Sequence, residues 1–530
     1  MQGTNVLFGQ IAVVFGIVIA GVWGATQWTA AALGYQVRLG SPWFDFLGTP
    51  IYHPWKLFEW WFVFDAYAPR VFDTGGAIAG GSGLLALVVA IGMSIWRSRQ
   101  SRLVTTYGSA PWATAEALRK AGLIETGVHA MPIFAAPGDK QAPLNQLFRQ
   151  LRLSRRAFAV REQLGSEIRF PGRTLRFTND PAVLTAEVGR EFPACADRFV
   201  HLRQAIAACD PFQPAAWRSA RQFVADILGE PQLEEMLLLP LMVYGNPEEE
   251  DMDLRQFVIM FRAVFEEGFF RPAGTIRDFL DQLVRQYQGF GGELRLRCPV
   301  AEILVRDGRA AGVRLGDGTE LSAEDVLSTA GIPETIRLSG WPEEPAGYTG
   351  RMSFMETVSV VPRQQADATI GSRTIVFYSL APTFHYRRPD TLLDTSWGVI
   401  CCPANFADRS PTHASHLPVT NTASHPRWQA LAPADYAAAK VRWTEAAVRA
   451  SEEIIGQYHQ SVVYQDSFTP VTIERFTRKA GGAVYGSPVK LRDGRTPLAH
   501  LFVAGTDQGY LGIVGAMLSG VTVVNSHLLQ

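Results

Sequence analysis

The stretch LFVAGTDQGYLGIVGAMLSG, residues 501–520, combines an acidic residue with glycines where a strand-like run gives way to a helical one. The apolar run Leu501–Ala504 is followed by Gly505 and Asp507. A carboxylate at the carboxyl end of a strand can accept hydrogen bonds from hydroxyl groups. A helix that follows the glycine-spaced segment would offer free N–H groups and a positive dipole end to negative charge. The pattern predicts a ligand-binding turn, the alternative being a glycine-rich turn with an ordinary capping Asp.

An upstream segment supplies the elements that would position this turn. Residues 291–331 contain β-rich runs interrupted at Asp307-Gly308 and Gly316-Asp317-Gly318, both of which are hairpin signals. The segment ends in the apolar run Val326–Ala330. The simplest interpretation is a three-stranded meander that feeds back into a larger sheet.

Four segments, in this order, resemble the phytoene desaturase and carotenoid isomerase branch of the FAD-dependent amine-oxidase-like superfamily, which also includes retinol saturases. They are GFFRPAGTIRDFLDQL, GGELRLRCPVAEILV, GVRLGDGTELSAEDVLSTAG and HLFVAGTDQGYLGIVGAMLSG. The resemblance runs over residues 129–530 and implies an α/β flavoprotein body of the FAD/NAD(P)-binding Rossmann-like type with an α+β substrate region. The implied FAD-binding parts are residues 276–335 and 490–530, and the substrate region comprises 180–275 and 345–475.

The resemblance also implies roles for individual residues. The backbone of Val300, in the strand with Pro299 and Ile303, matches the position that meets the adenine of FAD. Asp507 matches the acid that faces the ribityl and pyrophosphate groups. The turn before the last helix matches the segment beside the flavin ring: Gly512, Ile513, Val514 and Gly515. Tyr485 and Gly486 fall near the expected flavin face, and no catalytic residue is assigned, because hydride transfer to a flavin depends chiefly on positioning and a tuned ring.

The same resemblance implies an apolar polyene substrate in a tunnel. Residues 200–270 carry apolar side chains at helical spacing, a pattern that by itself favours plain core helices over a substrate channel. Strand-like segments at 351–361, 373–380 and 396–402 would complete the tunnel wall. Because such substrates dissolve in lipid, the implied partners are an apolar small molecule and a membrane.

The sequence lacks a clear form of the superfamily's amino-terminal phosphate-binding turn, G-x-G-x-x-G after a strand. The one candidate, Gly81–Ala86, lies in an uncharged run and is followed by arginines where the ribose-binding acid is expected. Glycine packing within a membrane helix explains it better. We therefore expect a flavoprotein body that is incomplete at its N-terminus and binds FAD weakly or not at all. A second departure is Ala273, where the family commonly has glycine.

Two uncharged runs predict a transmembrane hairpin within residues 1–103. Residues 6–28 and 74–96 contain no charged side chain, and each is long enough to cross a bilayer. Arg97, Arg99 and Arg102 follow the second run, so the positive-inside rule places the body in the cytoplasm, attached to the inner membrane. The aromatic connection between the runs suits a membrane interface.

The first 128 residues resemble the amino-terminal region of TraG-type conjugal-transfer coupling proteins of type IV secretion systems. The resemblance rests on the two spans, the YGSAPWAT box and the helix EALRKAGL, for which Thr114, Glu116, Lys120 and Gly122 provide start and stop signals within the linker 104–128. No G-x-x-x-x-G-K-[ST] motif occurs in the sequence, so a motor ATPase function is not implied. The alternative function is a membrane component of conjugal transfer without ATPase activity.

Composition adds few constraints. The formal net charge of −1 gives no reason to expect nucleic-acid binding. The five cysteines are scattered and indicate neither disulfides nor a zinc site. His413, His416 and His425 lack neighbouring ligands at metal-binding spacing, which favours a surface loop over a metal site. The oligomeric state cannot be inferred from the sequence.

Overall fold

The computed structural model describes residues 2–102 and 130–529, except for residues 137, 141, 155–157, 214, 409–412 and 510–511. The chain divides into two compact units, residues 1–109 and 110–530. The predicted helix within 104–128 lies outside the described residues.

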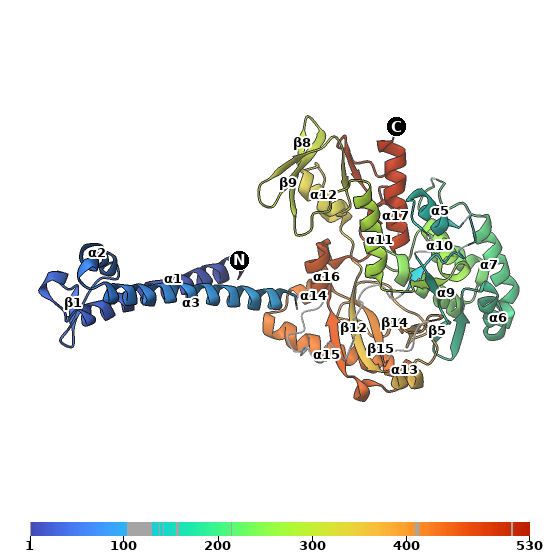
Figure 1. Cartoon of the computed structure of the whole chain (residues 1–530). Coiled ribbons are helices and arrows are strands. Elements are labelled where there is room, and N and C mark those ends of the chain that lie inside the picture. Colours follow the sequence, from blue (N-terminus) through green and yellow to red (C-terminus); the bar gives the residue numbers. More distant parts are fainter. Residues whose placement is uncertain are drawn as a thin grey trace. The chain divides into compact units, whose positions relative to one another are not determined.

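The first unit is a helical hairpin with a small cap (Figure 1). Its elements are α1 (Gln2–Ala32), β1 (Phe44–Phe46), β2 (Thr49–Ile51), α2 (Lys56–Phe64) and α3 (Pro69–Arg102). Helices α1 and α3 contain the two predicted spans, so the prediction of two long apolar helices is confirmed. They pack closely because small residues face each other: a Cβ atom added to Gly21 would lie 2.0 Å from Cβ of Ser82, and one added to Gly75 would lie 2.4 Å from Oγ1 of Thr29.

The second unit is built around a seven-stranded sheet with the order β16-β12-β15-β14-β13-β5-β6. The strands are antiparallel except for the parallel pair β13 and β5. Their bounds are β5 (Ser166–Phe170), β6 (Arg173–Phe177), β12 (Ser353–Pro362), β13 (Ile375–Ser379), β14 (Trp397–Cys401), β15 (Ala414–Ala423) and β16 (Tyr464–Phe468). The three predicted strand segments are therefore confirmed, and β5 and β6 join the sheet from ahead of the predicted substrate region.

Alternating side chains of this sheet enter two separate cores. In β13, Ile375 and Phe377 belong to one hydrophobic cluster, while Val376 and Tyr378 belong to the other, as the two-residue period of a strand requires. The first cluster includes α6 (Pro181–Glu191), α7 (Ala196–Ala208), α8 (Ala220–Leu228), α9 (Pro231–Gly245) and α10 (Leu254–Phe261). The second includes α13 (Arg363–Thr369), α14 (His425–Gln429) and α15 (Pro433–Ile455). Helices thus cover both faces (Figure 1).

One segment that we expected to be a surface loop is a central strand. His416 lies in β15 and pairs with Val360 of β12, and His425 is buried at the start of α14, where its Nε2 lies 2.7 Å from Glu474 Oε2. The loop prediction for these histidines was wrong because their polarity outweighed the alternating apolar residues Leu417 and Val419, both fully buried.

The remaining strands form three small sheets. The predicted meander is confirmed as β8 (Val300–Arg306), β9 (Arg309–Leu315) and β10 (Glu320–Ser322). The apolar run that follows it is β11 (Val326–Ser328), which pairs in parallel with β17 (Leu501–Val503). The third sheet has the order β3-β7-β4, with β3 (Met131–Pro132), β4 (Val160–Glu162) and β7 (Phe269–Pro272). The other helices are α5 (Pro143–Gln150), α11 (Ile276–Gly289), α12 (Ile332–Ser339), α16 (Pro470–Thr477) and α17 (Gly512–Val523).

Candidate functional site

The candidate site is the turn between β17 and α17. After β17 the chain passes through Gly505, with φ of 96°, a short helical turn from Thr506 to Gln508, and Gly509, with φ of 126°. These left-handed values are readily adopted only by glycine, which explains why the sequence has glycine at both positions. Helix α17 then begins at Gly512, so residues 512–515, which we expected to form the turn before the last helix, are its first residues.

Asp507 lies at the centre of this turn, and its carboxylate is bonded on both sides. The side chain is buried; Oδ2 accepts a hydrogen bond from the backbone N–H of Ile332 at 2.7 Å, and Oδ1 accepts one from that of Ser487 at 2.9 Å. Ile332 is the first residue of α12, so the carboxylate also lies at the positive end of a helix dipole. Charge-assisted bonds of this kind are among the stronger hydrogen bonds in proteins. Asp507 therefore ties β17, α12 and the segment around Ser487 together.

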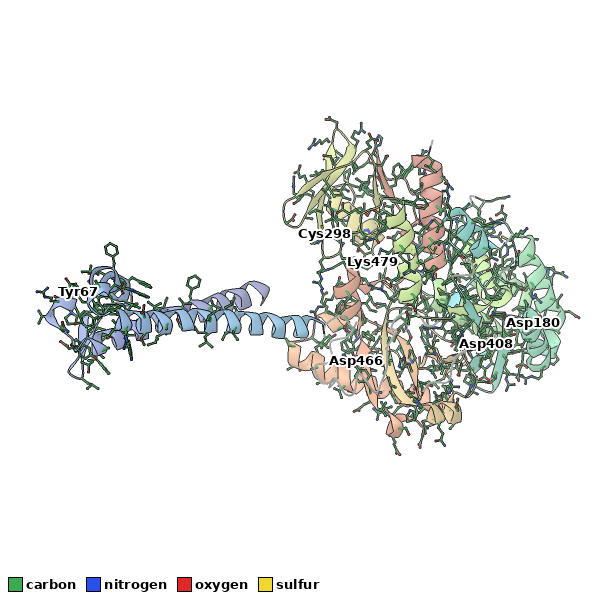
Figure 2. The ribbon with its side chains drawn as sticks, in the orientation of Figure 1. Tyr67, Asp180, Cys298, Asp408, Asp466 and Lys479 are labelled. Atoms are coloured by element: carbon green, nitrogen blue, oxygen red, sulfur yellow. The ribbon has the colours of Figure 1, made fainter. Side chains whose placement is uncertain are left out.

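Two glycines leave the room that Asp507 needs. A Cβ atom at Gly486 would lie 1.8 Å from Asp507 Oδ1, and one at Gly331 would lie 3.1 Å from Oδ2 and 2.3 Å from Lys479 Nζ. Both glycines have positive φ, 68° and 114°. Lys479 lies close to α12, beyond the end of α16 (Figure 2). We call Asp507, Gly331 and Gly486 the Asp507 clamp; sequence reasoning found its acid but assigned no role to the glycines.

Lys490 also holds this turn in place, through hydrogen bonds to two backbone carbonyl groups. Its Nζ donates hydrogen bonds to the carbonyl oxygens of Tyr485 at 3.0 Å and Thr506 at 2.9 Å. Burial lowers the pKa of Lys490 to about 8, although the negative charge of Asp507 opposes that shift. The lysine thus remains largely protonated at neutral pH and holds the two chain segments that flank the clamp.

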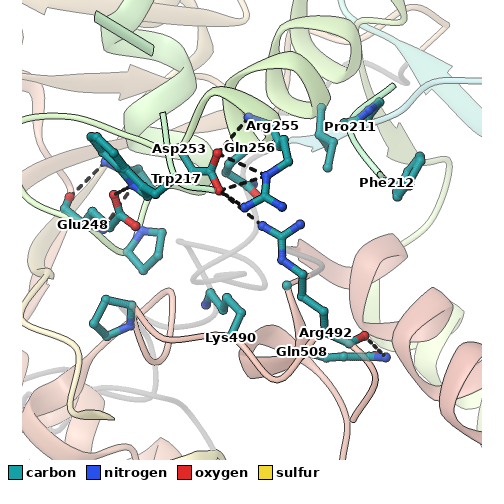
Figure 3. A pocket seen from close by; sticks show the side chains of 15 residues that line it. Pro211, Phe212, Trp217, Glu248, Asp253, Arg255, Gln256, Lys490, Arg492 and Gln508 are labelled. Atoms are coloured by element: carbon teal, nitrogen blue, oxygen red, sulfur yellow. Dashed lines mark hydrogen bonds and ion pairs between the residues drawn. The ribbon is translucent and has the colours of Figure 1, made fainter. Parts of the chain in front are cut away.

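A cavity of about 370 Å³ opens beside this turn (Figure 3). Its wall includes Gln508 and Gly509 from the turn, and helix α10 contributes to it together with the loop before α8 and the loop between α9 and α10. The lining includes one tryptophan and five charged side chains: Trp217, Glu248, Asp253, Arg255, Lys490 and Arg492. The sequence patterns did not reveal this cavity, because its charged residues are far apart in the chain.

Hydrogen bonds and ion pairs fix most of these side chains. Trp217 Nε1 donates to Glu248 Oε2 at 2.9 Å, and burial raises the pKa of Glu248. Asp253 Oδ2 accepts from Nη2 of Arg255 at 2.6 Å and from Nη2 of Arg492 at 3.2 Å. Figure 3 shows both guanidinium groups turned toward this carboxylate. The site can therefore hold charged groups in fixed positions.

The structure brings some of the sequence-predicted residues together and leaves one apart. Gly512 lies in the same segment as Asp507, while Val514 and Gly515 are buried and Ile513 is half-buried along α17. Val300 begins β8, where it is 39% exposed and pairs with Leu315 of the meander. Whether these residues bind FAD stays a prediction.

The residues around the turn fit the ring side of a flavin. A Cβ atom added at Gly505, Gly509 or Gly512 would meet no atom of the described residues within 4 Å, so a flat group could approach the backbone there. Gly81 to Gly83, the candidate phosphate-binding turn, lie inside helix α3. The residues directly before them are therefore helical and do not form a strand. The alternative that they form such a turn was wrong. In the described residues of the body that precede β8, no strand leads through a glycine-rich turn into a helix.

The body has a mixed α/β fold with a buried acid in a glycine-rich turn ahead of a helix. Residues 122–526 match the family model of the flavin containing amine oxidoreductases. The chain therefore belongs to this family, and FAD is its cofactor.

Curated relatives resemble parts of the chain, and a solved structure shares its fold. The chain is 26% identical over 192 residues to a lycopene-forming phytoene desaturase of Pseudescherichia vulneris, covering 31% of this chain and 38% of that protein. It is 23% identical over 242 residues to prolycopene isomerase 2 of an Oncidium hybrid cultivar, covering 43% and 39%. An oxidoreductase structure from Methanosarcina mazei shares the fold, with a TM-score of 0.50 and 15% identity over 75% of this chain and 87% of that one. The chain thus spans under two-fifths of these curated relatives.

The family match does not extend to the first unit. It begins at residue 122, so the helical hairpin lies ahead of it. The resemblance of residues 1–128 to conjugal-transfer coupling proteins is not shown by these comparisons. It stays a prediction made from sequence alone.

Proposed function

We propose that the body is a FAD-dependent oxidoreductase or isomerase that acts on polyenes or other apolar substrates. The observation that carries the proposal is the Asp507 clamp, whose acid lies in the turn ahead of α17, in a chain of the flavin containing amine oxidoreductase family. Bound FAD supplies the capacity to accept or return two electrons. The chain's own part is to position the substrate beside the open glycine turn and to exclude water from it.

Support for an apolar substrate comes from the relatives and from the cavity. Phytoene desaturases and a prolycopene isomerase are named for polyenes. Phe212 and Trp217 line the cavity and are 65% and 49% exposed, so they offer apolar surface to a ligand. Large exposed aromatic groups that gather at a cavity favour binding of an apolar molecule.

The first unit would serve as a membrane anchor. Val14–Ala32 and Pro69–Ala90 are long and apolar enough to cross a bilayer. Phe62 in α2 and Tyr67 just after it lie between the two long helices and are 92% and 87% exposed, which suits an interfacial aromatic belt. Figure 2 labels Tyr67. An anchor at the inner membrane, with the body in the cytoplasm, would bring the enzyme to substrates dissolved in lipid.

The proposal is tested with the full chain purified in detergent, supplied with FAD and incubated with phytoene or with prolycopene. Desaturation lengthens the conjugated system of phytoene, and isomerisation shifts the absorption of prolycopene, so both reactions appear in the visible spectrum. FAD binding without change in either polyene would reject the substrate class. Failure to bind FAD at any concentration would reject the enzymatic function of this chain.

A further inference from the structure

We infer that the free edge of β11 binds a β-strand of a second polypeptide, and that this strand continues through a glycine-rich turn into a helix. The inference rests on the proposed function, because it names a partner that would complete the FAD site of the same body. It goes beyond that function, which assigns the chain no protein partner.

The backbone hydrogen bonds of β11 run to one side, toward β17. The N–H of Val326 donates to the carbonyl oxygen of His500 at 2.8 Å, and the carbonyl oxygen of Ser328 accepts from the N–H of Ala504 at 2.9 Å. Because successive residues of a strand direct their N–H and C=O groups to opposite edges, those of Leu327 point away from β17. Among the described residues, no strand is bonded to that edge of β11.

The other edge of the pair is covered by a loop of the same body. Val503 of β17 donates its N–H to the carbonyl oxygen of Gly494 at 2.8 Å, and Arg495 forms an isolated bridge with Phe502. The edge at Leu327 is therefore the one at which this sheet can be extended. Two strands alone are marginally stable in water, so a third strand would stabilise the pair.

The chemistry of this edge selects an extended chain as its occupant. Unpaired backbone N–H and C=O groups of an edge strand bind another strand by forming a regular ladder. In doubly wound sheets of strand order 3-2-1-4-5-6, strand 1 precedes the glycine-rich phosphate-binding turn and lies next to strand 4. Strand β11 is followed by α12 and pairs in parallel with β17, as strand 4 does with strand 5. The free edge thus corresponds to the place of strand 1.

A parallel partner strand would bring its turn to the cofactor site. The carboxyl end of β11 is Ser328, and Gly331 and Asp507 of the clamp follow β11 and β17 at this end of the sheet. Ligands of open α/β sheets bind outside the carboxyl ends of the strands, where a glycine-rich turn and its helix can hold a pyrophosphate. The partner's turn and the clamp would therefore lie at the same end of one sheet.

A second segment of the body has the sequence of a strand but does not form one. Residues 293–297, ELRLR, alternate charged and apolar side chains, yet the structure assigns them to no strand. Leu294 and Leu296, which share one face in such a pattern, are 45% and 74% exposed. Exposed apolar side chains of this size are typical of a surface that a partner covers.

The probe for the test is a synthetic polypeptide of about 30 residues, with a valine-rich strand, a G-x-G-x-x-G turn and a helix. Its binding to the full chain in detergent is measured by fluorescence anisotropy and by hydrogen exchange at the Leu327 amide. We expect the probe to slow that exchange about fivefold or more, the effect of a hydrogen bond worth about 1 kcal/mol. FAD should bind about tenfold or more tightly to the complex than to the chain alone, a usual size of coupling between two ligands.

Two N-methylated forms of the probe are matched controls with the same composition. Methyl groups on alternate residues of its strand block the N–H groups of one edge in the first form and of the opposite edge in the second. One form should lose binding and the other should keep it. Equal binding of the two forms would overturn the inference, because the probe would not be held by a ladder at β11.

The outcomes separate the inference from the proposed function. A Leu327 amide that is already protected in the chain alone would overturn the inference, because another segment or a second copy of the chain would then cover the edge. Tight FAD binding by the chain alone, with no binding of the probe, would overturn the inference and leave the proposed function intact. Binding of the probe at β11 without any binding of FAD would reject the proposed function alone.

Discussion

The seven-stranded sheet and the β11–β17 pair differ in what supports them. Every inner strand of the large sheet has a hydrogen-bonded neighbour on each side, and large clusters cover both faces. In the described part of the body, β11 and β17 pair only with each other as named strands. Parallel strands need cover on both faces, and two strands alone are marginal in water. The β11–β17 region therefore depends more than the large sheet on contacts from outside its own strands.

The contacts of the small pair show what replaces strand neighbours there. Val503 packs with Ile332 and Trp341 in one small cluster, and Leu501 packs with Ile303 in another. The Asp507 clamp adds two charge-assisted hydrogen bonds. A region held by a few polar contacts is expected to open more easily than a large sheet and to gain stability from a ligand.

The largest effect is expected from a substitution that leaves a cavity in the core beside the seven-stranded sheet. Phe377 is fully buried in β13, and its ring lies 5.7 Å from that of Tyr244. Phe377→Ala should lower the free energy of unfolding by about 3–5 kcal/mol, the usual cost of removing a buried aromatic side chain. Chemical denaturation measures this, with Phe290→Ala as the control because Phe290 is 65% exposed. Equal losses in the two variants would contradict the burial that we describe.

The next effect concerns the clamp. In Gly486→Ala the added methyl group would collide with the Asp507 carboxylate. We expect the free energy of unfolding to fall by about 2–4 kcal/mol, because overpacking and the strain of a left-handed backbone add together. Hydrogen exchange should show that protection falls in β11 and β17 and is unchanged in β12 and β15. Loss of protection in both regions to the same extent would remove the distinction between them.

Gly172→Ala is the matched control for that variant. Gly172 has φ of 74°, close to the 68° of Gly486, but nothing lies within 4 Å of an added Cβ atom. The two variants therefore share the backbone strain, and only Gly486→Ala adds the collision. A Gly172→Ala variant that is destabilised as strongly as Gly486→Ala would show that the clamp is not the cause.

Asp507→Asn is expected to have a smaller effect. The amide keeps the shape of the side chain but removes its charge and turns an N–H group toward a backbone N–H, which should cost about 1–3 kcal/mol. Denaturant melts of the full chain measure the loss, and Asp317→Asn, in a hairpin turn of the meander, should change it by about 0.5 kcal/mol or less. No difference between the two variants would mean that the bonds to Ile332 and Ser487 do not stabilise the fold.

The smallest effect is expected at Glu267, beside β7, which belongs to neither region. Burial raises the pKa of this half-buried residue to about 7, and its Oε2 has no hydrogen-bond partner in the described part of the chain. The folded state therefore keeps a proton that the unfolded state releases near pH 4.5, so stability should fall as pH rises through this window. Glu267→Gln should reduce that fall between about pH 5 and 8 by about 1–2 kcal/mol. A melting temperature with the same pH dependence in both proteins would contradict the assignment.

Local patterns predicted most of the elements around the β11–β17 pair. The hairpin signals at Asp307-Gly308 and Gly316–Gly318 located the meander, and the run at Leu501 located β17. These predictions were correct because turns and short apolar strands are determined by residues that are neighbours in the sequence. Helices α1 and α3 were predictable for the same reason.

Features that join distant segments were not predictable. Strand β5 pairs with β13 across about 200 residues of intervening chain, which no local pattern encodes. The role of Gly486 depends on a carboxylate at position 507, and the cavity depends on Arg255 and Arg492 meeting at Asp253. The strand β15 was missed because His416, together with His413 and His425 on either side of it, suggested a loop.

The most direct test of the account is a FAD titration of the full chain, repeated after a strand, a glycine-rich turn and a helix are inserted ahead of His129. We expect weak binding by the chain as it stands, since a helix N-terminus and its hydrogen bonds to the pyrophosphate contribute about 1–2 kcal/mol and about 1 kcal/mol each. We expect tight binding after the insertion, and Gly486→Ala should abolish it whereas Gly172→Ala should not. Stoichiometric flavin absorbance in the unmodified purified chain, or tight binding that Gly486→Ala leaves unchanged, would contradict the account.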